Sequence, residues 1–514
     1  MDATRTQQQH SRRWIILAFL GLAQLMVVLD ATIVNVALPS IQKSLGFSNV
    51  DRQWLITAYS LAFGSLLFLG GRLSDLLGRK TTLQIGLIGF AFASALGGAA
   101  QSFSMLVTAR AVQGAFGAVL APAALAMVTT AFTDPKERGK AFGIYGSIAG
   151  AGAAIGLLLG GILTQYLDWR WTLYVNLLFA GIALVGTQVL LERERGAASG
   201  GLDVLSTSLI SGGLFAIVFG LSNAATTATN DASAGMTVTL GTAFGNATTI
   251  ACLVGGVSLV ALFAWRQTRI ERPMLPMGVV LDRARGGSFL SILIAAASMF
   301  ATFFFLTFYL QQVHGYSPVR TGLAFLPMVA VLSATAATAS TKLLPRLGPR
   351  PLTTTGMALG AGAMVIFAQL GVTSSYSTHV LPGLLVAGMA MGLVFATSIN
   401  TATARVRPEY AGSASATVNV TQQVGGSIGT ALLSTVAIAA SIAFLPKGFH
   451  VPADPTAAQV ALFNAGQVQG YTTAFWWAAA MFAAGAVIAG LVLPSGRPVL
   501  AGGRPEPELV AVAN

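Results

Sequence analysis

Long apolar runs separated by short polar segments extend along almost the whole chain. A helix needs about 20 apolar residues to cross the hydrocarbon core of a bilayer, and a window of that length finds fourteen candidate helices. They begin near Trp14, Trp54, Thr81, Leu106, Gly139, Trp171, Val204, Thr248, Gly287, Thr321, Leu352, Val380, Gly412 and Thr472. The pattern predicts an all-α integral membrane protein with fourteen transmembrane helices, arranged as six, an inserted pair and six.

The same pattern divides the chain into six parts. We expect a cytoplasmic N-terminal tail (1–13), an N-terminal six-helix half (14–191), an inserted helix pair (192–266) with an external loop at 223–246, a cytoplasmic basic linker (267–286), a C-terminal six-helix half (287–493) and a cytoplasmic tail (494–514). Pro446, Pro452 and Pro455 predict a second external loop at 444–470. The first apolar run is too long for a signal peptide and is expected to remain as a span.

Charge indicates the orientation. Charged residues are only 9% of the chain and the mean hydropathy is +0.72, which excludes a soluble globule, a disordered chain and a nucleic-acid binder. With the N-terminus inside, the cytoplasmic segments hold 23 of the 29 Lys and Arg residues. The external loops hold Lys43, Arg52, Arg170, Arg320 and Lys447. This bias predicts that both termini are cytoplasmic.

The number of spans depends on the inserted pair. Deleting both of its helices would leave every later loop on the same side, so charge alone leaves twelve and fourteen spans open. Residues 204–222 and 248–265 contain no charged residue. The apolar character of these two segments favours fourteen spans.

Residues suited to enzymatic chemistry are scarce. The single cysteine, Cys252, lies in an apolar stretch, which excludes an internal disulfide and a cysteine-based metal site. There is no Walker loop, and the histidines lie in the N-terminal tail or in predicted outer loops, at His10, His314, His379 and His450. We therefore expect no enzyme activity, no cofactor and no metal.

A ten-residue charged segment, Gly71-Arg-Leu-Ser-Asp-Leu-Leu-Gly-Arg-Lys80, joins two apolar runs and predicts a tight membrane hairpin. We expect Gly71 and Gly78 to let the backbones approach closely. Arg72, Arg79 and Lys80 would stay with anionic headgroups on the cytoplasmic side.

This segment resembles the loop between spans two and three of major facilitator superfamily transporters, Gly-x-Leu-x-Asp-x-x-Gly-Arg-Lys. The resemblance implies that Asp75 helps to hold the cytoplasmic side closed during alternating access, supported by Arg72 and Arg79. The alternative is that all are solvated charges that set topology. The equivalent loop in the second half, 342–350, keeps Gly348 but has Pro345 in place of the acid.

Two opposite charges lie inside the predicted spans. An arginine inside a span costs about 2.5 to 3.5 kcal/mol on insertion scales, so Arg110 needs a partner or a wet cavity. Asp30 lies about 24 Å along span one, at the depth of Arg110 in span four. Asp30 is therefore a candidate proton-binding carboxylate paired with Arg110, and the alternative is a fixed ion pair between the two spans.

The sequences around Asp30 and Arg110 resemble those of the fourteen-span drug/proton antiporter branch of the superfamily. That branch has a first span similar to Leu29-Asp-Ala-Thr-Ile-Val-Asn-Val-Ala-Leu-Pro39 and a fourth span with Arg-x-x-Gln-Gly, here 110–114. The resemblance implies that Asp30 and Arg110 take part in proton coupling. Further similar segments are 169–176, 309–318 and 422–429, so the likeness covers 14 to 495.

A row of glycines marks span five: Gly152, Gly156, Gly160 and Gly161. Their helical spacing makes a stripe without side chains, where another helix can pack closely. The family antiporters usually have a proline after the middle glycine, and Leu157 stands there in this chain. This departure weakens the prediction of antiport and keeps a symporter open.

The substrate is indicated only by class. The candidate cavity residues are Asn35, Gln113, Phe304, Phe308 and Gln423. The phenylalanines share an aromatic face that suits a flat apolar compound or simply packs against a neighbour. The lack of acids inside spans seven to fourteen argues against doubly charged cations and favours a neutral, weakly cationic or amphipathic compound.

Together these features predict proton-coupled efflux of lipophilic small molecules, drugs or antibiotics, by alternating access. A symporter that imports a nutrient and a non-transporting receptor are the alternatives. The expected partners are a small lipophilic substrate, protons and the lipid bilayer, without nucleic acid. We expect a monomer that crosses a bacterial inner or plasma membrane many times.

Overall fold

The computed structural model describes residues 2–48, 51–132, 135–191, 203–233, 240–271, 273–404, 406, 411–446, 449 and 456–495, and these form helices without a strand. The N-terminal half comprises α1 (Asp2–Leu45), η1 (Asp51–Gln53), α2 (Trp54–Leu77), α3 (Arg79–Gly98), α4 (Phe103–Ala131), α5 (Pro135–Tyr166) and α6 (Trp171–Leu190). Next come α7 (Val204–Ser233), α8 (Leu240–Phe244), α9 (Ala247–Gln267) and α10 (Met277–Val280).

The C-terminal half has the same kind of long helices, interrupted by short π-helical turns. It comprises α11 (Arg283–Phe308), η2 (Tyr309–Val313), α12 (Pro318–Thr338), η3 (Ala339–Leu343), α13 (Leu344–Leu347), α14 (Pro349–Phe367), η4 (Tyr376–Val380), α15 (Leu381–Thr403), α16 (Ala411–Phe444) and α17 (Ala457–Val492). In the described part of the chain, eleven helices are long and apolar enough to cross a membrane.

Short polar residues set several helix starts. The Ser102 hydroxyl accepts a hydrogen bond from the Met105 amide at the start of α4, and Ser317 accepts one from Arg320 before α12. Such N-caps satisfy amide groups that have no partner inside the helix. The predicted helix starts at Trp54, Trp171 and Val204 coincide with those observed.

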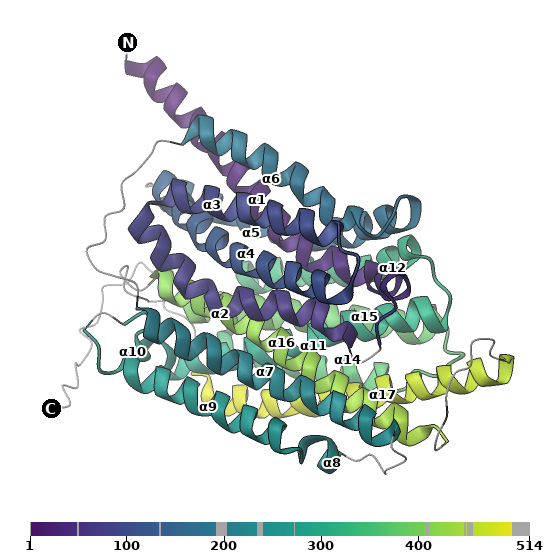
Figure 1. Ribbon diagram of the computed structural model, residues 1–514. Helices are drawn as coiled ribbons and strands as arrows, with labels where there is room; N and C mark the ends of the chain where they lie inside the picture. The colour runs from purple at the N-terminus through teal and green to yellow at the C-terminus, as the bar shows by residue number, and fades with distance from the viewer. Residues whose placement is uncertain are drawn as a thin grey trace.

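The long helices run roughly parallel in one bundle (Figure 1). We call the end where α1 begins and α17 ends the inner end, and the opposite end the outer end. α1 packs on α5 and α6, and α11 packs on α16. The two halves meet where α2 contacts α16 and where α5 contacts α12.

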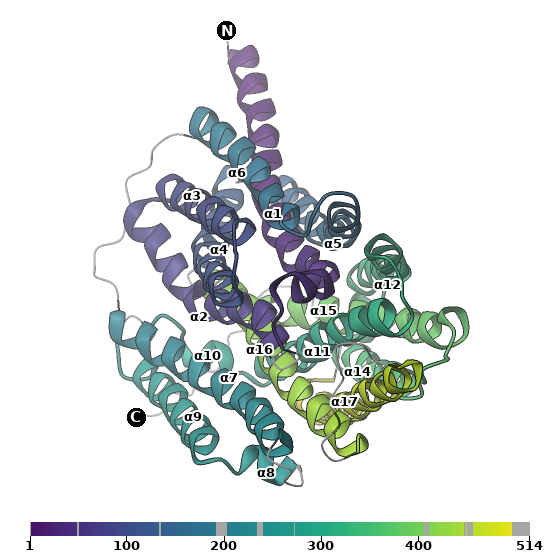
Figure 2. The same cartoon turned by 45° about the vertical axis from the view of Figure 1, so that its right-hand side comes forward.

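The helices α7 and α9 lie side by side at the edge of the bundle (Figure 2). α7 covers the seam between α2 and α16, where Leu61 and Val424 join an apolar cluster with it, and α9 packs on α7. Arg266 pairs with Asp203 at 3.0 Å and links the end of α9 to the start of α7. The inserted pair therefore buttresses both halves from outside.

One large apolar core joins the two halves toward the outer end. Its members from the N-terminal half come from the outer parts of their helices, including residues 29–41 of α1 and Leu157 of α5. The inner parts of α1, α2 and α4 belong to a second core, which lies mainly within the N-terminal half and against which Ala416 and Val420 of α16 also pack. The halves are thus held together most firmly at the outer end.

The charged segment 71–80 is shorter as a turn than predicted. Residues 71–77 continue α2, and the reversal is made at Gly78 alone, whose φ of 87° is accessible to glycine. α3 then begins directly at Arg79. Gly348 makes the corresponding turn before α14 with a φ of 79°, so the same single-glycine reversal occurs in each half.

Two predicted external loops are partly helical, which corrects those boundaries. α7 continues to Ser233, and Asn223 ties it to α9 by donating a hydrogen bond to the Thr249 hydroxyl at 3.0 Å. α17 begins at Ala457 rather than Thr472, because Thr456 and Gln459 form a capping box. The predicted N-terminal tail is helical from residue 2. The C-terminal tail from 496 lies outside the described residues.

Candidate functional site

A buried polar cluster gathers around Asp30 in the middle of the N-terminal half. Asp30 of α1, Gln113 of α4, Asn176 of α6 and Ser94 of α3 are all fully buried, and Arg110 of α4 is 2% exposed. These side chains come from four helices, each of which is apolar on most of its surface. Tertiary packing therefore brings the polar residues of four spans to one point.

The Asp30 carboxylate accepts three hydrogen bonds in this cluster. Arg110 donates from Nη1 at 2.5 Å, Gln113 from Nε2 at 3.1 Å and Asn176 from Nδ2 at 2.7 Å. The structure thus places Asp30 and Arg110 in direct contact, at the shared depth expected from the sequence. Hydrogen bonds to a carboxylate are among the stronger ones in proteins, so these three bonds join α1 to α4 and α6.

Arg110 is held on its other sides as well. Its Nε donates to the Leu55 carbonyl at 3.2 Å, its Nη1 also donates to Gln113 Oε1 at 3.0 Å, and its guanidinium lies 4.4 Å from the Tyr59 ring centre. Burying a charge without such partners costs several kcal/mol per ion. Loss of the negative charge on Asp30 would leave Arg110 as an unpaired buried cation. The contacts of Arg110 therefore join Asp30 of α1 to α2 and α4.

Gln113 is part of the Asp30 cluster. We expected it in the substrate cavity, but its amide also donates to Ser94 at 2.7 Å and its oxygen accepts from Arg110. Its amide nitrogen and its amide oxygen both make hydrogen bonds within the Asp30 cluster. The Arg-x-x-Gln spacing places both side chains on one helix face, which is the signal in the sequence for this arrangement.

The remaining cavity candidates are placed separately. Asn35 is nearly buried and donates to the Ala31 carbonyl of its own helix. Gln423 of α16 lies opposite Gly64 of α2, and its Oε1 is buried without a hydrogen-bond partner among the described residues. Phe304 and Phe308 are fully buried on α11 beneath a basic side chain of the other half. Gln423, Phe304 and Phe308 therefore lie at the interface between the halves.

That basic side chain is Arg52, which the sequence indicated as an external loop residue. It lies in η1 and is only 4% exposed, with its guanidinium carbon 3.9 Å from the Phe308 ring centre. The segment that contains Arg52 is polar, as exposed loops are, so hydropathy alone did not predict that Arg52 is buried. The interface between the halves therefore contains a buried cation.

The residues of the predicted latch have diverse contacts. Lys80 donates to the carbonyls of Gln188 at 3.0 Å and Leu191 at 2.6 Å, which caps the C-terminal end of α6. Arg72 is half-buried. A methyl group on Gly71 would have Pro122 Cβ as its nearest neighbour, at 4.0 Å. The close approach to α4 is made by Gly70 instead. The side chain of Asp75 lies outside the described part of the structure.

The glycines of span five lie against two neighbours. Gly152, Gly156 and Gly160 face α1, where a methyl group on Gly160 would lie 2.7 Å from the Ile33 carbonyl oxygen. Gly161 faces the start of α12, where a methyl group on it would lie 2.7 Å from Val319 Cα. The row therefore permits close contact with the helix that carries Asp30 and with the opposite half.

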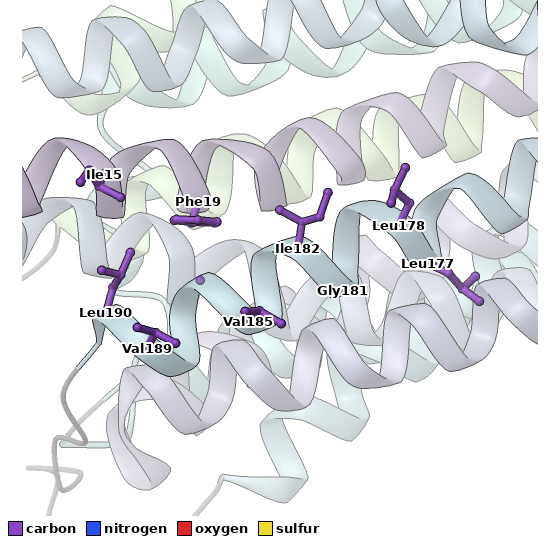
Figure 3. A pocket seen from close by; sticks show the side chains of 10 residues that line it. Ile15, Phe19, Leu177, Leu178, Gly181, Ile182, Val185, Val189 and Leu190 are labelled. Atoms are coloured by element: carbon purple, nitrogen blue, oxygen red, sulfur yellow. The ribbon is translucent and has the colours of Figure 1, made fainter.

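An apolar groove of about 710 Å³ runs between α1 and α6 (Figure 3). It is lined by Ile15, Phe19, Leu177, Leu178, Gly181, Ile182, Val185, Gly186, Val189 and Leu190. Phe19 precedes Asp30 by about 16 Å along α1. Because these lining residues are all apolar, the groove does not supply proton chemistry, and its exposed leucines and isoleucines form a surface suited to lipid.

The family model described as Major Facilitator Superfamily matches residues 20–430. The chain is 44% identical over 497 residues to the puromycin resistance protein pur8 of Streptomyces alboniger, covering 96% of this chain and 94% of that protein. It is 31% identical to the multidrug efflux pump LfrA of Mycolicibacterium smegmatis, covering 88% and 86% of the two chains.

A solved structure shares the fold. The structure is a bacterial homologue of the human lysosomal transporter Spinster, inward-facing and occupied, with a TM-score of 0.64 and 16% identity. The match covers 93% of this chain and 96% of the other. At this identity the likeness concerns the arrangement of the helices alone.

Proposed function

This chain belongs to the major facilitator superfamily of membrane transporters, and on that premise we propose that it exports lipophilic drugs or antibiotics in exchange for protons. The family match and the many apolar helices make it a multi-pass protein of the cell membrane. Similarity to relatives named for puromycin resistance and multidrug efflux supports export of a small lipophilic compound. This is transport and not enzymatic catalysis.

The observation that carries the proposal is the buried Asp30 cluster. Among the described residues of the spans, Asp30 is the acid with a full set of donors around it, from Arg110, Gln113 and Asn176. Proton binding would cancel the charge that holds Arg110 and weaken contacts among α1, α4 and α6. Buried ionisable residues in membrane spans commonly mark proton pathways. We assign Asp30 as the coupling carboxylate and Arg110 as its counter-charge.

Alternating access follows from the division into two halves. The six helices α1–α6 and the six long helices from α11 to α17 would rock about the interface where α2 meets α16 and α5 meets α12. The shared outer core supports a state closed at the outer end. In this scheme the turns at Gly78 and Gly348, with Asp75, Arg72 and Arg79, close the inner end in the opposite state.

The topology of the proposal is fourteen spans with both termini in the cytoplasm and α7 and α9 as an inserted pair. The basic bias of the predicted inner segments supports this orientation. The halves are 14–191 and 287–493, and a monomer contains the complete pathway.

Proteoliposomes with an imposed pH gradient would test the proposal. Lipophilic dyes and antibiotics are added to wild type, Asp30→Asn and the control Asp168→Asn, whose carboxylate is half-exposed at the outer end and paired with Arg170. We expect substrate and protons to move in opposite directions in wild type and in Asp168→Asn, and no substrate-driven proton flux in Asp30→Asn. Movement in the same direction would establish a symporter, and binding without flux would establish a receptor.

A further inference from the structure

Arg52 is a buried cation without an acidic partner among the described residues. It belongs to the N-terminal half, whereas the rings around it, Phe304 and Phe308 of α11 and Tyr471 of α17, belong to the C-terminal half. Its guanidinium carbon is 3.9 Å from the Phe308 ring centre and 5.2 Å from that of Phe304. The face of the guanidinium is therefore covered by aromatic rings across the interface.

The edge of the same guanidinium is not satisfied. Nη2 has one long hydrogen bond to the Tyr471 hydroxyl, at 3.5 Å, and the buried Nη1 has no partner in the described part of the protein. The neighbouring Asp51 carboxylate accepts instead from the Ser48 hydroxyl, at 2.6 Å. Aromatic faces attract a cation but do not replace the hydrogen-bond acceptors of its N–H groups.

The next polar residues along the chain are also buried without partners. Gln53 is fully buried, and neither its amide nitrogen nor its amide oxygen has a hydrogen-bond partner in the described residues. The Thr57 hydroxyl, one helical turn further along α2, is equally buried and unpaired within that part of the chain. Unsatisfied groups of this kind are rare in folded proteins and call for an explanation, such as a ligand that completes them.

The electrostatic balance at this interface is positive. The sequence from 283 to 492 contains only two acids, Glu409 and Asp454, and both lie outside the described residues. In the N-terminal half, Asp30 is already neutralised by Arg110. A substrate with an anionic oxygen would offset the charge of Arg52, whereas a cationic substrate would add to it.

We propose that Arg52 and Gln53 form a substrate-recognition site for an acidic oxygen, a carboxylate, phenolate or enolate, on an aromatic compound. The guanidinium donates to that oxygen through Nη1, and Gln53 completes the contact with its amide. Phe304 and Phe308 hold the guanidinium by its face and offer an apolar wall to the substrate rings. This inference rests on the proposed efflux function and specifies the substrate class.

Rocking of the halves would open this site. Arg52 moves with the N-terminal half and the rings move with the C-terminal half, so opening of the outer end would separate them. The same side chains would then lie on the path by which the compound leaves. The site is therefore assigned to the outer part of the pathway, apart from the Asp30 cluster.

Three probes with one ring system test the charge preference. They are pyrene compounds carrying a butyrate, the matching carboxamide and the matching trimethylammonium group. Binding to the purified full chain is measured by fluorescence anisotropy for wild type, Arg52→Gln, Arg52→Lys and the control Arg320→Gln. Arg320 also stacks on an aromatic ring, Tyr316, at 3.8 Å, but it is exposed.

We expect wild type to bind the butyrate about 10- to 100-fold more tightly than the carboxamide, because a hydrogen bond to a charged group is worth about that much. Arg52→Gln should lose this preference without weakening the carboxamide, Arg52→Lys should keep part of it, and Arg320→Gln should resemble wild type. Because Arg52→Lys keeps the charge, it also provides a folded variant if Arg52→Gln is unstable.

Equal binding of butyrate and carboxamide by wild type would overturn the inference. So would an equal loss for all three probes in Arg52→Gln, which would make Arg52 only a contact that closes the outer end. Transport is measured separately in liposomes. If wild type binds the butyrate preferentially but carries none of the probes, the efflux function fails while the recognition site stands.

Discussion

Replacement of Gly160 by alanine tests whether close packing of α5 on α1 supports the Asp30 cluster. A methyl group at this position would lie 2.7 Å from the Ile33 carbonyl oxygen and 3.3 Å from its Cα. Carbon–oxygen contacts are normally about 3.3 to 3.6 Å. Since the obstacle is backbone and not a side chain that can rotate, α1 or α5 has to shift by about 0.6 Å or more to restore that separation.

Two effects of this substitution have opposite signs. Alanine favours a helix over glycine by about 0.5 to 1 kcal/mol, whereas overpacking costs about 1 to 3 kcal/mol. Because the cost of overpacking exceeds the gain in helix propensity, we expect a net destabilisation of about 0.5 to 2 kcal/mol. Asp30 precedes Ile33 by one helical turn, so the shift would also disturb its bond to Arg110.

The assay is thermal unfolding of the purified protein, together with substrate-driven proton flux in liposomes. The matched control is Gly181→Ala in α6, where a methyl group would meet no atom within 4 Å. That control should be neutral or slightly stabilised. A Gly160→Ala variant as stable and as active as wild type would refute the packing argument.

Other contacts give further predictions. Lys80→Met should lower the melting temperature by removing the cap of α6, a loss of about 0.3 to 1 kcal/mol, whereas Lys342→Met, exposed in the other half, should not. In a double-mutant cycle of unfolding free energies, Asp203→Asn and Arg266→Gln should show a coupling energy of about 1 kcal/mol or less that falls with added salt. Zero coupling would show that the pair does not anchor the inserted helices. Burial, and then the charge of Arg320, lower the pKa of His314 from its ordinary 6.5. The folded chain therefore binds fewer protons at this side chain than the unfolded chain, and the free energy of unfolding falls as pH drops below about 6.5. His314→Gln should reduce that pH dependence in thermal unfolding measured between about pH 8 and 5, and an unchanged profile would exclude the histidine as its source.

The two buried charge systems have different consequences for transport. Asp30 and Arg110 neutralise each other within one half, so their contact can change when a proton binds. Arg52 lies between the halves, and it forms no ion pair with the described residues around it. The proposed sites for proton coupling and substrate recognition are therefore separate. They are connected through α2, which follows Arg52 and supplies the Leu55 carbonyl to Arg110.

Several features could be predicted from the sequence because they depend on local hydropathy. The starts of α2, α6 and α7 match the predicted positions, and the depth of Asp30 and Arg110 along their spans follows from helix rise alone. Where polar segments continue as helix, at the end of α7 and the start of α17, hydropathy was misleading. Backbone hydrogen bonds and caps, not apolar content, decide those boundaries.

By itself, the sequence determined a multi-pass helical membrane protein, its family and the presence of an acid and a base inside the spans. Only the tertiary structure decided that Gln113 and Asn176 complete the hydrogen bonds of Asp30, and that Arg52 is buried beneath Phe308. Membrane insertion depends on the summed hydropathy of one segment, which is a local property. Partners of a polar side chain depend on which distant helices pack together, and no single segment contains that information.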